Sequence, residues 1–147
     1  LRILSAFYGI LKPMDGVTPY RLEMQAKAEI EEKTNLYDYW GDRLYHSVID
    51  DSRTIINLAS KEYSKCIERY LSDKDNYITI TFCELSGDKL VTKGTYAKMA
   101  RGEMVRFMAE NNIENPVDIQ KFDRLGYTFR GNLSSETEYV FERKIIK

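Results

Sequence analysis

The chain has 147 residues, of which 43% are hydrophobic and 31% are charged, a composition typical of a globular protein with a packed core. Its 22 basic and 23 acidic residues leave a formal net charge of -1, so any nucleic-acid site must come from a local cluster of cations. Two cysteines and one histidine are too few for a disulfide framework or a histidine-rich metal site. No apolar run approaches the ~20 residues of a membrane-spanning helix. We predict a cytoplasmic protein that holds no metal ion and no cofactor.

The first half of the chain alternates short apolar segments with loops. Residues 1–11 are apolar almost throughout and predict a buried strand, which a loop with Pro13 and Gly16 then ends. Residues 19–24 read as extended, because proline disfavours helix before it. Apolar residues at three- and four-residue spacing predict a helix within 33–51.

A second group of elements follows a β-branched strand at residues 54–58. Ser60 occupies the N-cap position of a helix predicted from residue 61 to about residue 71. Alternating apolar residues around a Ser-Gly-Asp turn predict a hairpin over 77–92.

The strongest predicted helix covers residues 95–111, and Asn115-Pro116 opens a shorter one. Residues 127–130 and 138–145 predict two strands joined by a polar loop, a C-terminal hairpin. Strands and helices therefore intermingle, and we predict a mixed α/β (α+β) fold: a small mixed sheet with packed helices, part of a larger single-domain fold.

Two groups of residues in the first half could carry chemistry. Arg21 and Glu23 would share one face of a strand, where an arginine fork can hold a phosphate and a carboxylate can transfer a proton. Trp40 is the single tryptophan, and Asp42 follows Asp38 by one helical turn, so the carboxylates could shift each other's pKa. The alternative is a solvated ion pair on a strand edge, with Trp40 in the core and both aspartates facing water.

Two further groups lie at helix beginnings. Asn57, Ser60 and Tyr63 surround a strand-to-helix junction, where helix amides favour anions, although Ser60 could simply cap the helix. Lys98 and Arg101 are three residues apart on one helix face, and the neighbouring Gly102 would let a ligand come close. Such a pair suits a phosphate, although two cations on a helix are most often a solvated face.

Together these segments resemble the YaaA family of peroxide-stress proteins. The resemblance is carried by motifs at residues 4–15, 19–24, 36–42, 56–63, 96–102, 126–129 and 139–143, in that order. Family members carry a further N-terminal portion, so the resemblance implies that residues 1–147 are the C-terminal portion of a YaaA-like domain. It also implies a response to hydrogen peroxide that limits unincorporated iron and so limits iron-dependent oxidative damage.

Three hypotheses follow for the mechanism. In the first, Lys98, Arg101 and Arg21 line a basic cleft that contacts the phosphate backbone of DNA. In the second, the chain acts on a nucleotide-like or nucleoside-like molecule, with Glu23 or Asp42 as the candidate catalytic acid or base. The other ligand-binding candidates are then Arg21, Trp40, Asn57, Ser60, Tyr63, Lys98 and Arg101. In the third, these side chains only brace the fold.

The apolar character of residues 1–11 leads to one more expectation. A strand of this kind is normally covered on both faces, so we predict self-association through this N-terminal region where nothing else covers it.

Overall fold

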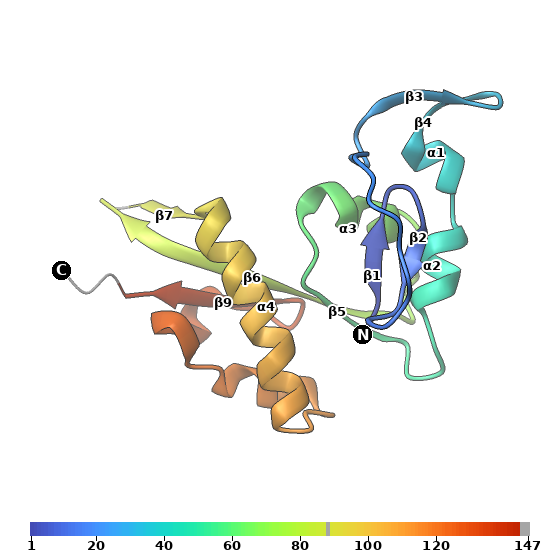
Figure 1. The fold of residues 1–147 in the computed structure, drawn as a ribbon. Helices are drawn as coiled ribbons and strands as arrows, with labels where there is room; N and C mark the ends of the chain where they lie inside the picture. Colours follow the sequence, from blue (N-terminus) through green and yellow to red (C-terminus); the bar gives the residue numbers. More distant parts are fainter. Residues whose placement is uncertain (88, 145–147) are drawn as a thin grey trace. The chain divides into compact units, whose positions relative to one another are not determined.

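The computed structural model describes residues 1–87 and 89–144, which divide into two compact units (Figure 1). Residues 1–55 and 59–76 form the first unit. Residues 56–58 and the chain from Tyr77 onward form the second. Helices and a sheet with both parallel and antiparallel pairs confirm the predicted mixed α/β class.

The first unit consists of two small hairpins and three short helices. Its elements are β1 (Ile3–Ser5), β2 (Gly9–Leu11), β3 (Lys27–Ile30), β4 (Lys33–Asn35), α1 (Leu36–Trp40), α2 (Arg43–Val48) and α3 (Lys61–Glu68). β1 pairs antiparallel with β2, and β3 pairs antiparallel with β4. Its buried apolar residues include Met24, Leu36, Leu44 and Cys66.

The prediction of one strand over residues 1–11 is wrong, because the segment turns back on itself as the β1–β2 hairpin. Inside the turn the Ser5 hydroxyl accepts a hydrogen bond from the Tyr8 amide at 2.9 Å. Gly9 then takes a φ of +77°, and a Cβ atom there would lie 2.8 Å from the Trp40 ring. The tight turn and the tryptophan packed over it therefore need glycine at this position.

The helix predicted within 33–51 is interrupted. Its first residues belong to β4, and the remainder divides into α1 and α2 at Gly41, whose φ is +54°. The Asn35 side chain caps α1 by accepting from the Asp38 amide at 2.9 Å. A single helix cannot pass a residue in the left-handed region, so the regular apolar spacing covers two helices.

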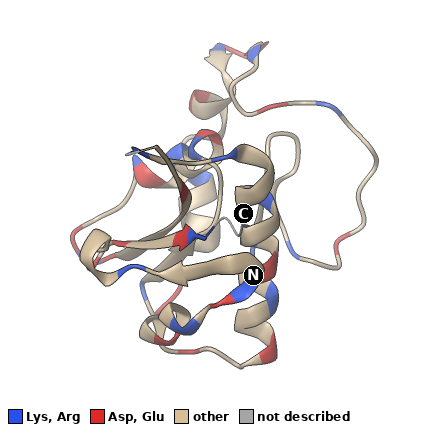
Figure 2. Cartoon of the chain, turned by 90° about the vertical axis from the view of Figure 1, so that its left-hand side faces the viewer, with Lys and Arg blue, Asp and Glu red and all other residues tan. Residues whose placement is uncertain are grey.

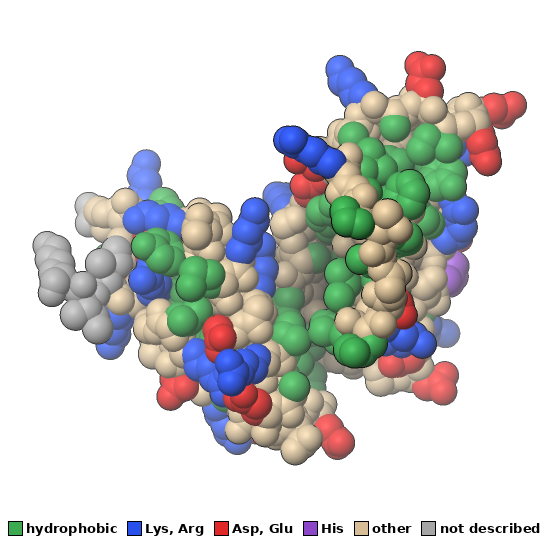
Figure 3. All heavy atoms as spheres, in the orientation of Figure 1, with side chains coloured by type: hydrophobic (Ala, Val, Ile, Leu, Met, Phe, Trp, Pro, Cys, Tyr) green, Lys and Arg blue, Asp and Glu red, His purple; other side chains and the backbone are tan. Residues whose placement is uncertain are grey.

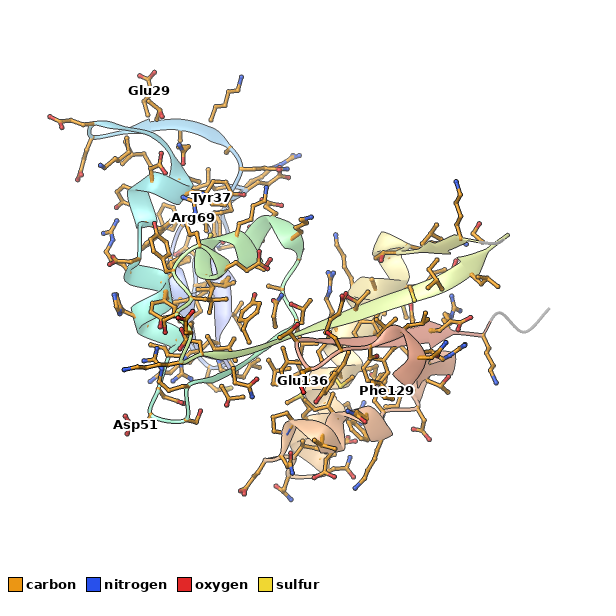
Figure 4. The ribbon with its side chains drawn as sticks, turned by 180° about the vertical axis from the view of Figure 1, so that it is seen from behind. Glu29, Tyr37, Asp51, Arg69, Phe129 and Glu136 are labelled. Carbon is orange, nitrogen blue, oxygen red and sulfur yellow. The ribbon has the colours of Figure 1, made fainter. Side chains whose placement is uncertain are left out.

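Helix α3 and the first turn of α1 are joined by contacts of Tyr37, in α1, with Glu62 and with Arg69, the C-cap residue of α3 (Figure 4). The Tyr37 hydroxyl donates to the Glu62 carbonyl at 2.9 Å, and the Arg69 guanidinium carbon lies 5.4 Å from the Tyr37 ring centroid. Ser60 is the N-cap residue of α3 as predicted, but its side chain makes no capping hydrogen bond.

A network of hydrogen bonds and an ion pair around Asp75 connects loops of the first unit. The Asp75 carboxylate lies 2.6 Å from Arg53 Nη2 and accepts hydrogen bonds from the Tyr45 hydroxyl at 2.8 Å and the Ser72 amide at 2.7 Å. Arg53 has a φ of +54°, an uncommon conformation for a residue with a side chain. The network holds two loops, around residues 50–53 and 72–76, against each other.

The second unit is built on a five-stranded sheet. Its strands are β5 (Thr54–Asn57), β6 (Asn76–Ser86), β7 (Lys89–Val91), β8 (Tyr127–Phe129) and β9 (Glu138–Arg143). The order is β5-β6-β9-β8, and β7 pairs with β6. β6 and β9 run parallel, with Thr79 opposite Glu138 and Glu84 opposite Arg143, whereas β7 and β8 are antiparallel to their partners.

Helix α4 (Gly94–Glu110) lies across one face of this sheet (Figure 1). Alternate residues of β6 and β9 face it, as the two-residue period of a strand requires. The core between helix and sheet consists of Ile78, Ile80, Phe82, Ala97, Ala100, Met104, Phe107, Ile119, Phe122, Tyr127, Tyr139 and Phe141.

The predictions for the second half are largely confirmed. The β6–β7 and β8–β9 hairpins and helix α4 lie where the sequence placed them, and a 3-10 helix (Pro116–Lys121) follows Asn115. Two more 3-10 turns (Arg124–Gly126 and Gly131–Leu133) flank β8. Asp88 and Ile145, which belonged to the predicted hairpins, lie outside the described residues.

Candidate functional site

The nine candidate side chains are distributed over both units. Six of them belong to the first unit and three to the second. The first set is Arg21, Glu23, Trp40, Asp42, Ser60 and Tyr63, and the second is Asn57, Lys98 and Arg101.

Within the first unit, the pKa of Tyr63 responds to burial and to the charges of its surroundings. Burial raises the pKa of the Tyr63 hydroxyl, and the charges of Glu62, Tyr20 and Glu23 raise it further, while a hydrogen bond with the Met24 backbone opposes them. Residues 19–24 form no strand, so the predicted strand face for Arg21 and Glu23 is wrong, and both side chains are exposed. Glu23 therefore lies in a loop and is exposed, and its charge adds only a minor part to the raised pKa of Tyr63.

An aromatic cluster of Phe7, Tyr8 and Tyr20 adjoins this loop. The Tyr20 ring centroid lies 5.4 Å from that of Phe7 and 5.6 Å from that of Tyr8. Hydrogen bonds hold the cluster, because Tyr20 Oη lies 2.5 Å from Ser5 Oγ and the Thr18 amide donates to the Tyr8 hydroxyl at 2.9 Å. Phe7 is 58% exposed and Tyr20 is 42% exposed, so the cluster presents aromatic surface to solvent.

Trp40 has a clear structural task. Its indole nitrogen donates to the Ala6 carbonyl at 2.9 Å, and its ring packs over Gly9. It thereby fixes the β1–β2 turn to helix α1. Asp42 is exposed, and its carboxylate lies 3.3 Å from His46 Nε2 one turn further along α2.

In the second unit, Asn57 joins two strands of the sheet. It is buried, and its side-chain amide donates to the Thr79 hydroxyl of β6 at 3.3 Å. This contact lies within the sheet, so it explains the burial of Asn57 without a ligand.

Lys98 and Arg101 lie on one flank of α4, about 60° apart around the helix. Lys98 is exposed, whereas Arg101 is half-buried and its Nε atom has no hydrogen-bond partner in the described structure. Burial lowers the pKa of the Arg101 guanidinium, because desolvation disfavours its charge. Both cations precede the first acidic residue of the helix, Glu103.

Sequence reasoning missed one group of charged side chains, which surrounds Glu84. Glu84 as a whole residue is 1% exposed, and it occupies the next inward-facing position of β6 after Ile80 and Phe82. Lys93 forms an ion pair with it, and Arg143 Nη1 lies 3.5 Å from its other oxygen. The signal was present in the sequence, because alternation places residue 84 on the apolar face of its strand.

Neither cysteine has the environment of a reactive thiolate. Burial raises the pKa of Cys66 to about 11, and burial also raises the pKa of Cys83, with the charge of Glu142 adding to it. Both cysteines are buried and neither forms a disulfide. A reactive cysteine needs the opposite, a lowered pKa and access to solvent.

The described residues form neither a metal-binding cluster nor a membrane-spanning helix. Residues 1–87 and 89–144 contain no cluster of three or more His, Cys, Asp or Glu side chains placed to hold a metal ion. Over the same residues, every helix is too short or too polar to cross a lipid bilayer.

Comparison with known proteins gives consistent matches along the chain. The family model described as "Peroxide stress protein YaaA" matches residues 1–133. A UPF0246 protein of Agathobacter rectalis is 80% identical over 145 residues, which are 99% of this chain and 58% of the relative. A UPF0246 protein of Lachnoclostridium phytofermentans is 57% identical over 141 residues, which are 96% of this chain and 55% of the relative.

A third relative, from Desulfitobacterium hafniense, is 55% identical and is covered over 56% of its length. This chain therefore spans a little more than half the length of the curated relatives that it matches. Because the family model covers most of the chain, the chain belongs to the family of the peroxide stress protein YaaA.

Proposed function

We propose that this chain serves in the bacterial response to hydrogen peroxide, in the cytoplasm, by associating with DNA and limiting iron-dependent damage to it. Membership of the YaaA family supports the peroxide-stress role. The contact with DNA is assigned to the phosphate backbone, through Lys98 and Arg101 of α4. Arg21 belongs to the other unit, so the proposal does not depend on it.

One observation carries the DNA proposal, an acid-free basic segment in a chain whose formal net charge is -1. Residues 89–102 contain Lys89, Lys93, Lys98 and Arg101 and no Asp or Glu. Elsewhere both signs of charge are mixed along the ribbon (Figure 2). Arg101 also carries a half-desolvated guanidinium, and a phosphate would restore the hydrogen bonds that burial removes.

A gel-shift titration of the chain with duplex DNA tests this proposal. Lys98→Ala should weaken binding to all sequences alike, by a few-fold at low salt, because it removes one phosphate contact. Lys65→Ala is the matched control, since Lys65 is an exposed helical lysine with Glu62 and Glu68 three residues to either side. Equal weakening by both substitutions contradicts the proposal, and so does a failure of the unsubstituted chain to bind DNA.

The cellular role has its own test, a complementation assay in a bacterium that lacks its YaaA protein. Under the proposal, Lys98→Ala in the corresponding full-length protein abolishes peroxide protection and leaves the melting temperature nearly unchanged. A variant that protects fully would show that Lys98 belongs to an ordinary solvated face.

A second candidate function is the binding or conversion of a nucleoside-like molecule in the first unit. The observations that favour it are the exposed rings of Phe7 and Tyr20 and the raised pKa of the half-buried Tyr63 hydroxyl, to which burial contributes most and the charge of Glu23 least. Aromatic rings stack on bases, and a carboxylate beside a phenol can act as general acid or base. A thermal-shift screen with nucleosides tests it, and a hit that survives in Tyr63→Phe would argue against this site.

Self-association is proposed through the N-terminal region, residues 1–11. Three of its apolar side chains are exposed (Figure 3): Leu1 at 63%, Ile3 at 44% and Phe7 at 58%. Light scattering should report a dimer or larger species that Phe7→Ser shifts toward monomer. Leu133→Ser, at a similarly exposed position of the second unit, is the control, and a monomer at all concentrations excludes this association.

A further inference from the structure

Glu84 is a charge placed where the sheet would be expected to bury an apolar side chain. It follows Ile80 and Phe82 on the face of β6 that α4 covers, and its carboxylate oxygens accept no hydrogen bond in the described structure. Replacing a buried ion pair by apolar residues is often neutral or stabilising, so stability alone is a weak explanation for such a carboxylate. The buried carboxylate of Glu84 does, however, hold the side chains of Lys93 and Arg143 in place.

Those cations, Lys93 and Arg143, lie on the solvent side of the buried acid. Their side chains are 52% and 27% exposed, while that of Glu84 is 2% exposed. One carboxylate cannot neutralise two cations, so the group presents one positive charge in excess to solvent. The Arg143 guanidinium is also fixed from the other side, because its carbon lies 3.8 Å from the centroid of the Tyr96 ring.

The place of this group in the fold adds to its positive potential. Glu84 and Arg143 lie opposite each other near the carboxyl ends of the parallel strands β6 and β9. Lys93 is the N-cap residue of the 17-residue helix α4, and its side chain makes no capping hydrogen bond. The amides of the first turn, from Gly94 to Tyr96, have no acceptor inside the helix. Anions bind at such a junction of strand ends and helix amides.

We propose that Lys93, Arg143 and the first amides of α4 bind the phosphate group of a phosphate monoester. A monoester carries a charge of about −1.5 to −2 at neutral pH, which matches two cations and a helix N-terminus better than a singly charged diester does. Glu84 is a positioning residue, because it is too buried to reach the ligand. The phosphate can belong to a nucleotide or to the 5′ end of a nucleic-acid strand.

This site is separate from the DNA contact proposed above and does not depend on it. Tyr96, which holds Arg143, lies about 140° around α4 from Arg101. The buried stripe of Ala97, Ala100 and Met104 lies between them. Substitutions on the two flanks can therefore be compared within one helix.

The test is an NMR titration of the ¹⁵N-labelled chain with inorganic phosphate at constant ionic strength and pH. Saturable shifts are expected at the amides of Gly94 and Thr95 and at the Arg143 side chain. Arg143→Ala should weaken the fitted affinity about tenfold, because it removes a charge-assisted contact. Lys93→Ala should do the same, and each variant leaves Glu84 paired with one cation, so the fold is expected to persist.

One control substitution and two ligand pairs complete the experiment. Arg106 pairs with Glu110 further along α4, so Arg106→Ala should leave phosphate binding unchanged. Tighter binding of a 5′-phosphorylated oligonucleotide than of its 5′-hydroxyl twin assigns the site to strand ends. Binding of adenosine monophosphate but not adenosine, with no difference between the oligonucleotides, assigns it to a small molecule. Absence of shifts at Gly94 and Thr95, or an unchanged fitted affinity in Arg143→Ala, overturns the proposal.

Discussion

At the scale of single residues, the two thiols separate this chain from proteins that react directly with peroxide. Cys66 has a pKa of about 11, and the thiolate is the species that oxidants attack. At pH 8 only about one Cys66 side chain in a thousand is ionised. Any peroxide protection by this chain is therefore expected to act downstream of the oxidant.

Thiol titration checks this expectation. In the native chain both cysteines should react with a disulfide reagent at pH 8 orders of magnitude more slowly than in the denatured chain. Cys66→Ala and Cys83→Ala assign the two rates. A rapid native reaction at either thiol would show that its site opens readily and would restore a direct role in peroxide chemistry.

Asp75 gives a residue-scale prediction about pH. Desolvation raises its pKa, but hydrogen bonds from Ser72 and Tyr45 and the charge of Arg53 together outweigh it, so the folded-state pKa lies below 3.8. A lowered carboxyl pKa contributes stability above the unfolded-state value, and that stability is lost as the pH falls through the folded-state value. Asp75→Asn should therefore lower the melting temperature at pH 7.

The same substitution should have a smaller effect at an acidic pH below the folded-state pKa, where the wild-type carboxylate is itself protonated. Thermal melts at both values measure the difference. Asp73→Asn, at an exposed position two residues away, is the control. Equal destabilisation by Asp75→Asn at both pH values would show that the charge of Asp75 contributes little.

At the scale of elements, Gly102 in α4 is the informative position. A Cβ atom there would meet nothing within 4 Å, and glycine lowers helix stability relative to alanine by roughly 1 kcal/mol. Gly102→Ala should raise the melting temperature, and Ala109→Gly should lower it. If the glycine exists to admit a DNA backbone beside Lys98, the stabilised variant will also bind DNA more weakly.

How well the elements could be predicted depends on how local their signals are. Helix α4 and the β6–β7 and β8–β9 hairpins follow from periodicity and turn residues within each segment. The β1–β2 hairpin does not, because its turn has no proline, and Gly9 is required by Trp40, which lies 31 positions later. The division of α1 from α2 at Gly41 similarly depends on backbone geometry that apolar spacing does not reveal.

The candidate site shows the same limit. The spacing of Lys98 and Arg101 correctly predicts a shared helix flank. The grouping of Glu84, Lys93 and Arg143 depends on the parallel pairing of β6 with β9, and nothing local to either strand encodes that pairing. Strand alternation marks Glu84 as unusual, but only the tertiary structure supplies its partners.

At the scale of the whole molecule, near neutrality limits the size of any DNA footprint. The formal net charge is -1 and the isoelectric point is about 6.0, so long-range attraction to DNA is weak. If Lys98 and Arg101 make the contacts, the logarithm of the binding constant should fall with the logarithm of salt concentration with a slope of about −2. A slope of about −6 or steeper would require a much larger basic surface than this chain offers.

The parallel pairing of β6 with β9 also sets the order in which the molecule can form during synthesis. The first unit is complete once residue 76 has been made, whereas the core of the second unit needs β9, which begins at Glu138. At about 5–20 residues per second, roughly 3–12 s pass between these events. During that time β6 does not yet have its parallel partner β9, and the core around Ile80 and Phe82 lacks Tyr139 and Phe141. The nascent second unit is thus the stage at which this chain most needs protection from aggregation.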